Sequence, residues 1–138
     1  MRHAVYELAV QTPGQGLIEC TRDVVRWVEG TGVDTGLLTL FVRHTSASLL
    51  IQENAAPAVR RDLQEYFARL APESDAYEHD DEGPDDMPAH LRSALTATSI
   101  AIPVIGGRPA LGTWQGIYLF EHRRRPHRRN IVLHLLGE

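Results

Sequence analysis

The alternation of apolar and polar residues predicts a chain built largely of strands. Residues 3–11 place Ala4, Tyr6, Leu8 and Val10 on one face, which is typical of a half-buried strand. Four further segments rich in apolar and β-branched residues are predicted as strands: 36–43, 99–105, 111–121 and 130–136.

The last three of these strands follow one another through short turns, over residues 106–109 and 123–129. Short turns join antiparallel neighbours, so these strands are expected to form an antiparallel meander. A further apolar run, over residues 45–51, directly follows the strand at 36–43.

Helical spacing occurs in three places between the strands. Thr21 is a candidate N-cap for a helix that reaches about Glu29, and Gly30 and Gly32 end it. A second helix is expected from Asn54 or Ala55, with Pro57 in its first turn and an inner face of Val59, Leu63, Tyr66 and Phe67. Asp86 is the predicted cap of a third, whose inner side would carry His90, Leu91, Ala94 and Leu95. Strands with segregated helices predict the α+β class, with a large antiparallel sheet or sandwich and two to three helices.

Length and composition narrow the class of protein further. A chain of 138 residues predicts a single domain over residues 1–138 and is too short for a (β/α)₈ barrel. All 14 basic residues are Arg, which excludes a Schiff-base lysine and a phosphate-loop lysine. Cys20 is the single cysteine, and no apolar run approaches the roughly 20 residues of a membrane helix. We therefore expect a cytoplasmic protein without a membrane segment.

The net charge of −4 conceals two opposite concentrations of charge. Residues 73–90 carry eight carboxylates and two histidines without any Arg, whereas residues 122–129 carry five Arg and two histidines. Histidine and carboxylate together are common ligands of a divalent cation. A turn at Gly83-Pro84 can fold the first half of the acidic segment back onto the second. A metal site and a solvated acidic loop are both consistent with this pattern.

The candidate ligands in the acidic segment are His79, Glu82, Asp86 and His90. Asp86 and His90 are four residues apart, so they share one helix face if the helix cap lies one residue before Asp86. The Arg-rich turn is expected to be solvated, to bind phosphate, or to pair with the acidic segment. It lacks interleaved aromatic residues, which argues against nucleic-acid binding.

Two other motifs carry polar side chains at predicted strand ends. His44-Thr-Ser-Ala-Ser48 offers hydrogen-bonding groups for an anion, or satisfies local backbone groups. In Gly112-Thr-Trp-Gln-Gly116, strand periodicity places Gln115 on the same side as Glu121. Trp114 points the opposite way, where we expect the core or a subunit contact, and the core is favoured.

Taken in order and spacing, the motifs starting at His44, Glu53, Glu82 and Leu111 resemble those of the YjbQ family, UPF0047, commonly labelled secondary thiamine-phosphate synthase. The likeness extends over residues 3–138. It implies an α+β fold assembled as a homotrimer, with a polar site near subunit boundaries that holds a divalent metal, Mg or Zn. The implied reaction transfers the hydroxymethylpyrimidine group from hydroxymethylpyrimidine pyrophosphate to thiazole phosphate and releases pyrophosphate.

The implied reaction suggests a role for each candidate residue. His79, Asp86 and His90 are the candidate metal ligands, and Glu82 is a catalytic carboxylate beside the ion. His44 and Glu121 are the other catalytic candidates, Glu121 by orienting a His or Arg. Ser46 and Arg123 are expected to contact phosphate, and Gln115 the pyrimidine edge. A metal-dependent hydrolase of a small phosphorylated metabolite and a non-catalytic metal-binding or ligand-binding trimer remain as alternatives.

Overall fold

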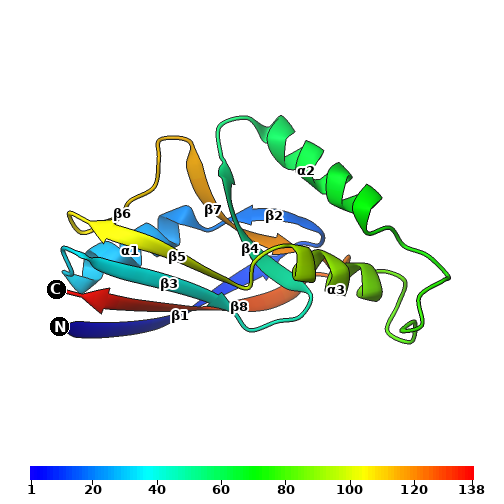
Figure 1. Ribbon diagram of the computed structural model, residues 1–138, viewed down its shortest axis with the longest axis horizontal. Coiled ribbons are helices and arrows are strands. Elements are labelled where there is room, and N and C mark those ends of the chain that lie inside the picture. The colour runs from blue at the N-terminus through cyan, green and yellow to red at the C-terminus, as the bar shows by residue number, and fades with distance from the viewer.

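A computed structural model describes all residues, 1–138, and confirms the α+β class with three helices and extensive antiparallel sheet (Figure 1). The strands are β1 (Arg2–Thr12), β2 (Gly16–Glu19), β3 (Gly36–Val42), β4 (Ala47–Glu53), β5 (Ser99–Ile105), β6 (Arg108–Pro109), β7 (Gln115–Glu121) and β8 (His127–Gly137). The helices are α1 (Thr21–Thr31), α2 (Pro57–Leu70) and α3 (Asp86–Leu95).

The strands form two antiparallel sheets. The larger sheet has the order β1-β8-β3-β5-β6, and the smaller has the order β2-β7-β4. β1 and β8 pair along their whole length, from Arg2 opposite Gly137 to Thr12 opposite His127. The two chain ends therefore lie side by side (Figure 1). This long pairing also brings the basic turn before β8 next to the end of β1.

The predicted meander of the last three strands is wrong. β5 and β8 both belong to the larger sheet, but β3 lies between them, and β7 belongs to the smaller sheet. The turn at Gly106-Gly107 leads only into the two-residue strand β6. The chain then crosses to the second sheet, where β7 pairs with β2 and β4. Two strands joined by a short turn need not pair with each other. Here β5 and β7 bury their apolar sides in different sheets, so each pairs within its own sheet.

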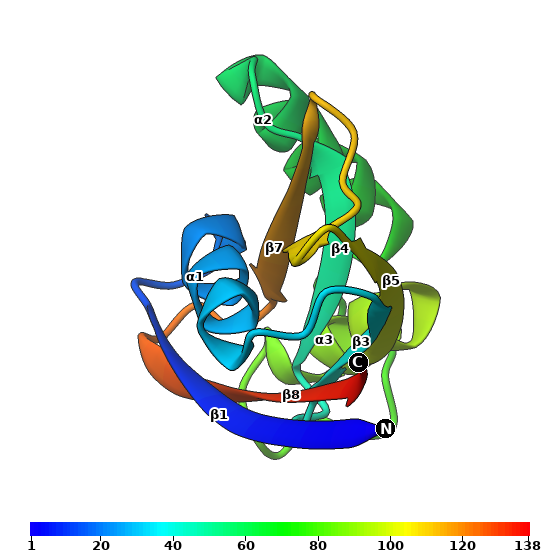
Figure 2. The ribbon, with the colours of Figure 1, turned by 90° about the vertical axis from the view of Figure 1, so that its left-hand side faces the viewer.

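The core lies between the two sheets and α1. It includes Leu38 and Leu40 from β3, Leu133 and Leu135 from β8, and Val28 from α1, all fully buried. Figure 2 shows α1 above β1 and β8 and beside β7. The alternation in β3 and β8 thus turns one side of the larger sheet toward α1 and the smaller sheet.

The start of α1 differs from the expectation that Thr21 caps it. Cys20 occupies the cap position, and the Thr21 hydroxyl instead donates to Glu19 and accepts from the Ile117 amide at 2.8 Å. The side chain therefore joins the helix to β7. The other end agrees with the prediction, since Gly32 closes α1 in the left-handed conformation.

The outer helices differ more from their predicted faces. α2 begins at Pro57, later than expected, contains no fully buried residue, and leaves Tyr66 51% exposed. In α3 the buried side holds Ala89, Arg92 and Ser93, whereas Ala94 and Leu95 are exposed. None of the three helices has the length and apolar content needed to cross a lipid bilayer.

Candidate functional site

The loop before α3 and the first turns of α3 bring together the four candidate metal ligands. One ligand atom from each of His79, Glu82, Asp86 and His90 lies within 4.8 Å of the others. The Asp86 Oδ2 atom is 2.9 Å from His79 Nε2 and 3.2 Å from His90 Nε2. His79 Nε2 is also 3.0 Å from Glu82 Oε2. These contacts place two imidazoles and two carboxylates around one point.

Local sequence explains this convergence. Asp85 takes the cap position of α3, one residue before the predicted cap, so Asp86 and His90 stand one above the other on the helix. Gly83 has φ +101°, a conformation that L side chains rarely adopt, and it lets the chain reverse before the helix. The reversal carries His79 and Glu82 back to Asp86.

The cluster combines a buried carboxylate with accessible histidines. Asp86 is 4% exposed, while the side chains of His79 and His90 are 44% and 33% exposed. The hydrogen bond with Asp86 raises the pKa of His79 above its ordinary value, with Glu82 contributing in the same direction. The cluster is therefore accessible to solvent at His79 and His90 and buried at Asp86.

Arg123 binds Asp86 and its neighbours through its guanidinium group. Its Nη1 atom donates to Asp86 Oδ1 at 2.8 Å, and its Nε atom donates to Asp85 Oδ2 at 3.0 Å. Its Nη2 atom donates to the Glu82 carbonyl. All three guanidinium nitrogens are thus bound to the acidic segment. Arg123 holds a candidate ligand in place, and its predicted contact with phosphate stays a prediction.

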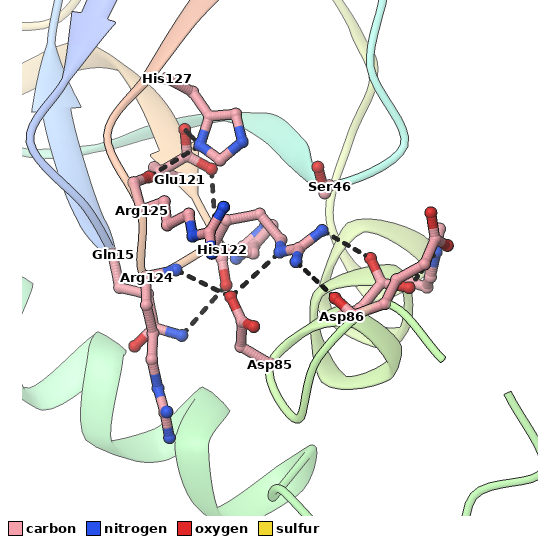
Figure 3. A network of polar contacts seen from close by, with 12 residues as sticks. Gln15, Ser46, Asp85, Asp86, Glu121, His122, Arg124, Arg125 and His127 are labelled. Atoms are coloured by element: carbon pink, nitrogen blue, oxygen red, sulfur yellow. Dashed lines mark hydrogen bonds and ion pairs between the residues drawn. The ribbon is translucent and has the colours of Figure 1, made fainter. Parts of the chain in front are cut away.

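The neighbouring pair Asp85 and Arg124 strengthens the same contact between the acidic segment and the basic turn (Figure 3). Burial acts to raise the pKa of Asp85, but hydrogen bonds from the Arg124 amide and Arg123 hold it below its ordinary value. The Arg124 side chain pairs with Glu73. The predicted pairing of the two charged segments therefore occurs within one chain.

A second polar cluster surrounds Glu121 at the end of β7. Its fully buried carboxylate accepts from Arg129 Nε at 2.7 Å and from the Thr12 hydroxyl at 2.7 Å. The Arg123 amide donates to the same carboxylate at 3.1 Å. The arginine that Glu121 binds is Arg129, and a catalytic role for this contact stays a prediction. Through Arg123, this cluster is continuous with the contact to Asp86.

His44 and Ser46 belong to this second cluster. Ser46 Oγ accepts from Arg129 Nη2 at 2.9 Å, and His44 Nε2 accepts from the Asn130 amide at 2.9 Å. Burial, and then the positive charge of Arg129, lowers the pKa of His44. Both side chains lie in the loop between β3 and β4 and accept hydrogen bonds from residues of β8. The structure does not bring them into the group of four candidate ligands.

Gln115 lies at the opposite end of β7 from Glu121. It begins β7, whereas Glu121 ends it, so six residue steps of about 3.3 Å separate them by roughly 20 Å. Gln115 Oε1 accepts from the Gly112 amide instead. The predicted pair of Gln115 and Glu121 is therefore not formed. The preferred core position of Trp114 is also wrong, because this side chain is 63% exposed.

Two residues that sequence patterns did not single out stand beside these clusters. His122 is fully buried and its Nε2 atom is 2.9 Å from Ser48 Oγ, while its Nδ1 atom has no partner. Arg92 is 8% exposed and has a buried Nε atom without a partner. In the sequence, Arg92 is only a charged residue within a predicted helix. The apolar spacing of that helix does not tell whether Arg92 faces the core or solvent.

The fold and the cluster of four define a small α+β protein with a histidine–carboxylate site at the start of a surface helix. The chain belongs to the YjbQ family: the family model described as UPF0047 protein YjbQ-like matches residues 6–138. The chain is 54% identical to UPF0047 protein sll1880 from Synechocystis sp., over 95% of this chain and 90% of that protein. It is 51% identical to UPF0047 protein YjbQ from Salmonella typhimurium, over 77% of each chain.

Solved structures show the same fold. An uncharacterized conserved protein of the YjbQ/UPF0047 family from Clostridium acetobutylicum superimposes with a TM-score of 0.88 at 31% identity, covering 95% of this chain and 99% of that one. A YbjQ-like protein of unknown function from Sulfolobus solfataricus also gives a TM-score of 0.88, at 24% identity, over 99% of this chain and 100% of that one. Its likeness concerns the fold alone.

Proposed function

We propose that this protein is a divalent-metal-dependent enzyme that acts on a small phosphorylated metabolite. The observation that carries the proposal is the convergence of His79, Glu82, Asp86 and His90 within 4.8 Å. Two of these groups come from a loop and two from a helix. The fold therefore holds the four donors together, although electrostatic repulsion between the carboxylates opposes this.

The donor set fits a divalent ion. Imidazole nitrogen favours zinc-like ions, whereas Mg²⁺ prefers oxygen ligands and retains its waters. Two imidazoles therefore support Zn²⁺ over Mg²⁺ at this cluster. The contact between Arg123 and the far oxygen of Asp86 is the kind of outer support that orients metal ligands in proteins. A bound ion of this type supplies Lewis acidity toward a phosphate oxygen or a bound water.

Residues of this chain have separate tasks in the proposal. Asp86 is held rigidly by Arg123, while His79 and Glu82 sit on the exposed side, where a substrate enters. Glu82 is 62% exposed and is the carboxylate best placed to exchange a proton with a substrate. Glu121 acts at a distance, because its carboxylate positions the backbone of Arg123.

The reaction to test first is thiamine phosphate formation from the pyrimidine pyrophosphate and thiazole phosphate. The thiazole nitrogen attacks the methylene carbon as the bond to pyrophosphate breaks, so the leaving group takes the electron pair and needs neutralisation. Hydrolysis of a phosphate ester is the second candidate, because the exposed side chains of His79 and His90 would leave a metal held there accessible to water and substrate.

Metal binding is tested by titrating chelator-treated protein with Zn²⁺ and with Mg²⁺ in a calorimeter. We expect one Zn²⁺ per chain, and at least about tenfold weaker binding in Arg123→Met, because outer-shell changes cost 10- to 100-fold in affinity. His90→Ala is expected to weaken binding further. His3→Ala, which changes a histidine on β1, is the matched control and is expected to bind normally. Equal binding by His90→Ala and by the unchanged protein would exclude this site.

Activity is tested by following turnover of the two thiamine precursors with Zn²⁺, with Mg²⁺ and after chelation. Product formed only with metal supports the transferase. Release of phosphate from a phosphate ester, without any synthase product, supports the hydrolase. Metal binding without turnover of either kind supports the non-catalytic trimer and contradicts the proposed enzyme.

A further inference from the structure

A cavity of about 430 Å³ opens beside α2, and none of the four candidate metal ligands lines it. Gln64 and Ala68 of α2 form one wall, and Gln15 and Phe120 lie on the side of the smaller sheet. Arg92 reaches it from α3. Its volume lies within the range of small-molecule sites, which is about 300–1,000 Å³.

Arg92 is the unusual residue of this cavity. It is only 8% exposed, yet no carboxylate oxygen lies within 4.0 Å of its guanidinium. Its Nη2 atom donates to the Ala71 carbonyl at 3.0 Å, and its buried Nε atom has no partner. A buried guanidinium is normally paired with an anion, because removing it from water is costly. Arg92 thus has unused donors at the wall of a cavity.

The other charged groups around the cavity do not supply the missing partner. Glu73 pairs with Arg124, and Glu121 pairs with Arg129. Glu65 also lines the cavity, but it is exposed to solvent and makes no ion pair. Burial lowers the pKa of Arg92, and the more distant charges of Glu73 and Asp85 do not offset this. Arg92 therefore has no ion-pair partner within the chain.

We infer that this cavity binds a small molecule through an oxyanion group, which Arg92 neutralises. A guanidinium presents paired N–H donors that match two oxygens of a phosphate or a carboxylate. Gln64, whose side-chain amide makes no hydrogen bond to another residue, supplies a further donor at the opposite wall. The site is separate from the four metal ligands and does not require the proposed metal chemistry.

The inference is tested on chelator-treated protein, so that anion binding through a metal ion is excluded. Inorganic phosphate, pyrophosphate and succinate are titrated separately by calorimetry. We expect saturable binding of at least one probe, weakened at least tenfold by Arg92→Met. Arg128→Met is the matched control, because Arg128 is exposed on β8 and donates no side-chain hydrogen bond, and its binding is expected to stay within twofold. Binding of phosphate and pyrophosphate but not succinate assigns a phosphate group, and the reverse result assigns a carboxylate.

A second pair of variants keeps the test independent of Arg92 and of folding. Ala68 is exposed on α2 and lines the cavity, and both Glu and Gln are good helix formers. Ala68→Glu adds a negative charge to the wall and is expected to weaken binding at least tenfold, whereas Ala68→Gln weakens it much less. Without anion, Arg92→Met is expected to melt at the same temperature as the unchanged protein or higher, because an unpaired buried charge is removed. Absence of binding for all three probes, or equal binding by Arg92→Met or Ala68→Glu, overturns the inference.

Discussion

Glu121 keeps its charge in the interior because three donors surround its carboxylate. Burial on its own raises the pKa of Glu121, but hydrogen bonds from Arg129, Thr12 and the Arg123 amide hold it below the ordinary value. The donors come from β8, β1 and the turn after β7. One side chain therefore ties both sheets to the basic turn.

Replacing Glu121 by Gln is expected to destabilise the protein by about 3–5 kcal/mol, because Arg129 is left buried without a counter-charge. Urea denaturation measures the loss. Glu7→Gln is the matched control: this exposed carboxylate lies 3.5 Å from Arg43, and such surface pairs contribute about 0–1 kcal/mol. Equal losses in both variants would show that the buried pair has no special role.

His122 makes stability depend on pH in a defined direction. Burial, and then the positive charge of Arg92, lowers the pKa of His122 to about 3. Between that value and the ordinary pKa of about 6.5, the unfolded chain binds a proton that the folded chain does not. The contribution of His122 is therefore complete above pH 6.5 and is lost as the pH falls toward 3.

We expect His122→Gln to remove this part of the acid sensitivity, which is on the order of 5 kcal/mol across the window, about 3 kcal/mol of it above pH 4. The measurement is the free energy of unfolding by urea at several pH values from 7 to 4 in both proteins. The two curves are expected to converge as the pH falls. Parallel curves would mean that the pKa of His122 is the same in the folded and unfolded protein.

At the scale of elements, two glycines near the C-terminal end of α1 have different roles. Gly32 closes the helix with φ +74°, which favours glycine, and its amide donates to the Glu29 carbonyl. Gly30 lies inside the same helix, and a Cβ added there would meet nothing within 4 Å. The same substitution is therefore expected to have opposite effects at positions two residues apart.

Gly32→Ala is expected to destabilise the protein by about 1 kcal/mol, because the left-handed conformation is strained for alanine. Gly30→Ala is expected to stabilise it by about 0.5–1 kcal/mol, since alanine is the better helix former. Thermal unfolding of the two variants gives the comparison. A loss of stability in Gly30→Ala would contradict its place inside the helix, and an unchanged stability in Gly32→Ala would contradict the role of Gly32 as the closing residue.

α3 shows why one helix face could not be predicted. Apolar spacing favoured Leu91, Ala94 and Leu95 as the inner side, yet Arg92 and Ser93 are buried and Leu95 is 57% exposed. The rotation of this helix depends on contacts with distant parts of the chain. Arg123 binds the residues at its start, and Arg92 donates to the Ala71 carbonyl. Periodicity within one segment contains no information about such partners.

The strands were easier to predict, because their signal is local. β5 coincides with its predicted range, and β1, β3 and β8 differ from theirs by at most three residues at either end. Alternation sets which side of a strand is apolar, and burial then follows that side. Pairing was harder: β7 was placed beside the wrong strands, since adjacency in the chain does not decide which sheet a strand joins.

At the scale of the whole molecule, the outer face of the larger sheet is unusually apolar. Val5, Leu37, Phe41 and Ile105 are each exposed by between 46% and 68%. Leu37 stands opposite Leu136, and Phe41 opposite Val132, so apolar side chains from neighbouring strands adjoin one another. An exposed apolar surface of this kind supports association with other copies of the chain.

We expect the protein to form a homotrimer through this face, and light scattering after gel filtration is expected to give three times 15.4 kDa. Leu37→Glu is expected to yield smaller species, because a charge on the face opposes its burial. Leu70→Glu changes a residue that is 50% exposed at the end of α2, and it is expected to leave the assembly intact. A monomer in the unchanged protein would contradict the expectation.

The sequence by itself determined the class of fold, most strands, and the group of four metal-ligand candidates. These depend on local features: alternation of apolar residues, a glycine that permits a chain reversal, and helical spacing between Asp86 and His90. Only the tertiary structure decided that Arg123 binds the acidic segment, that Gln115 lies apart from Glu121, and that Arg92 is buried beside a cavity. Each of these depends on which distant segments meet, and that is decided by how the two sheets and three helices bury their apolar faces together.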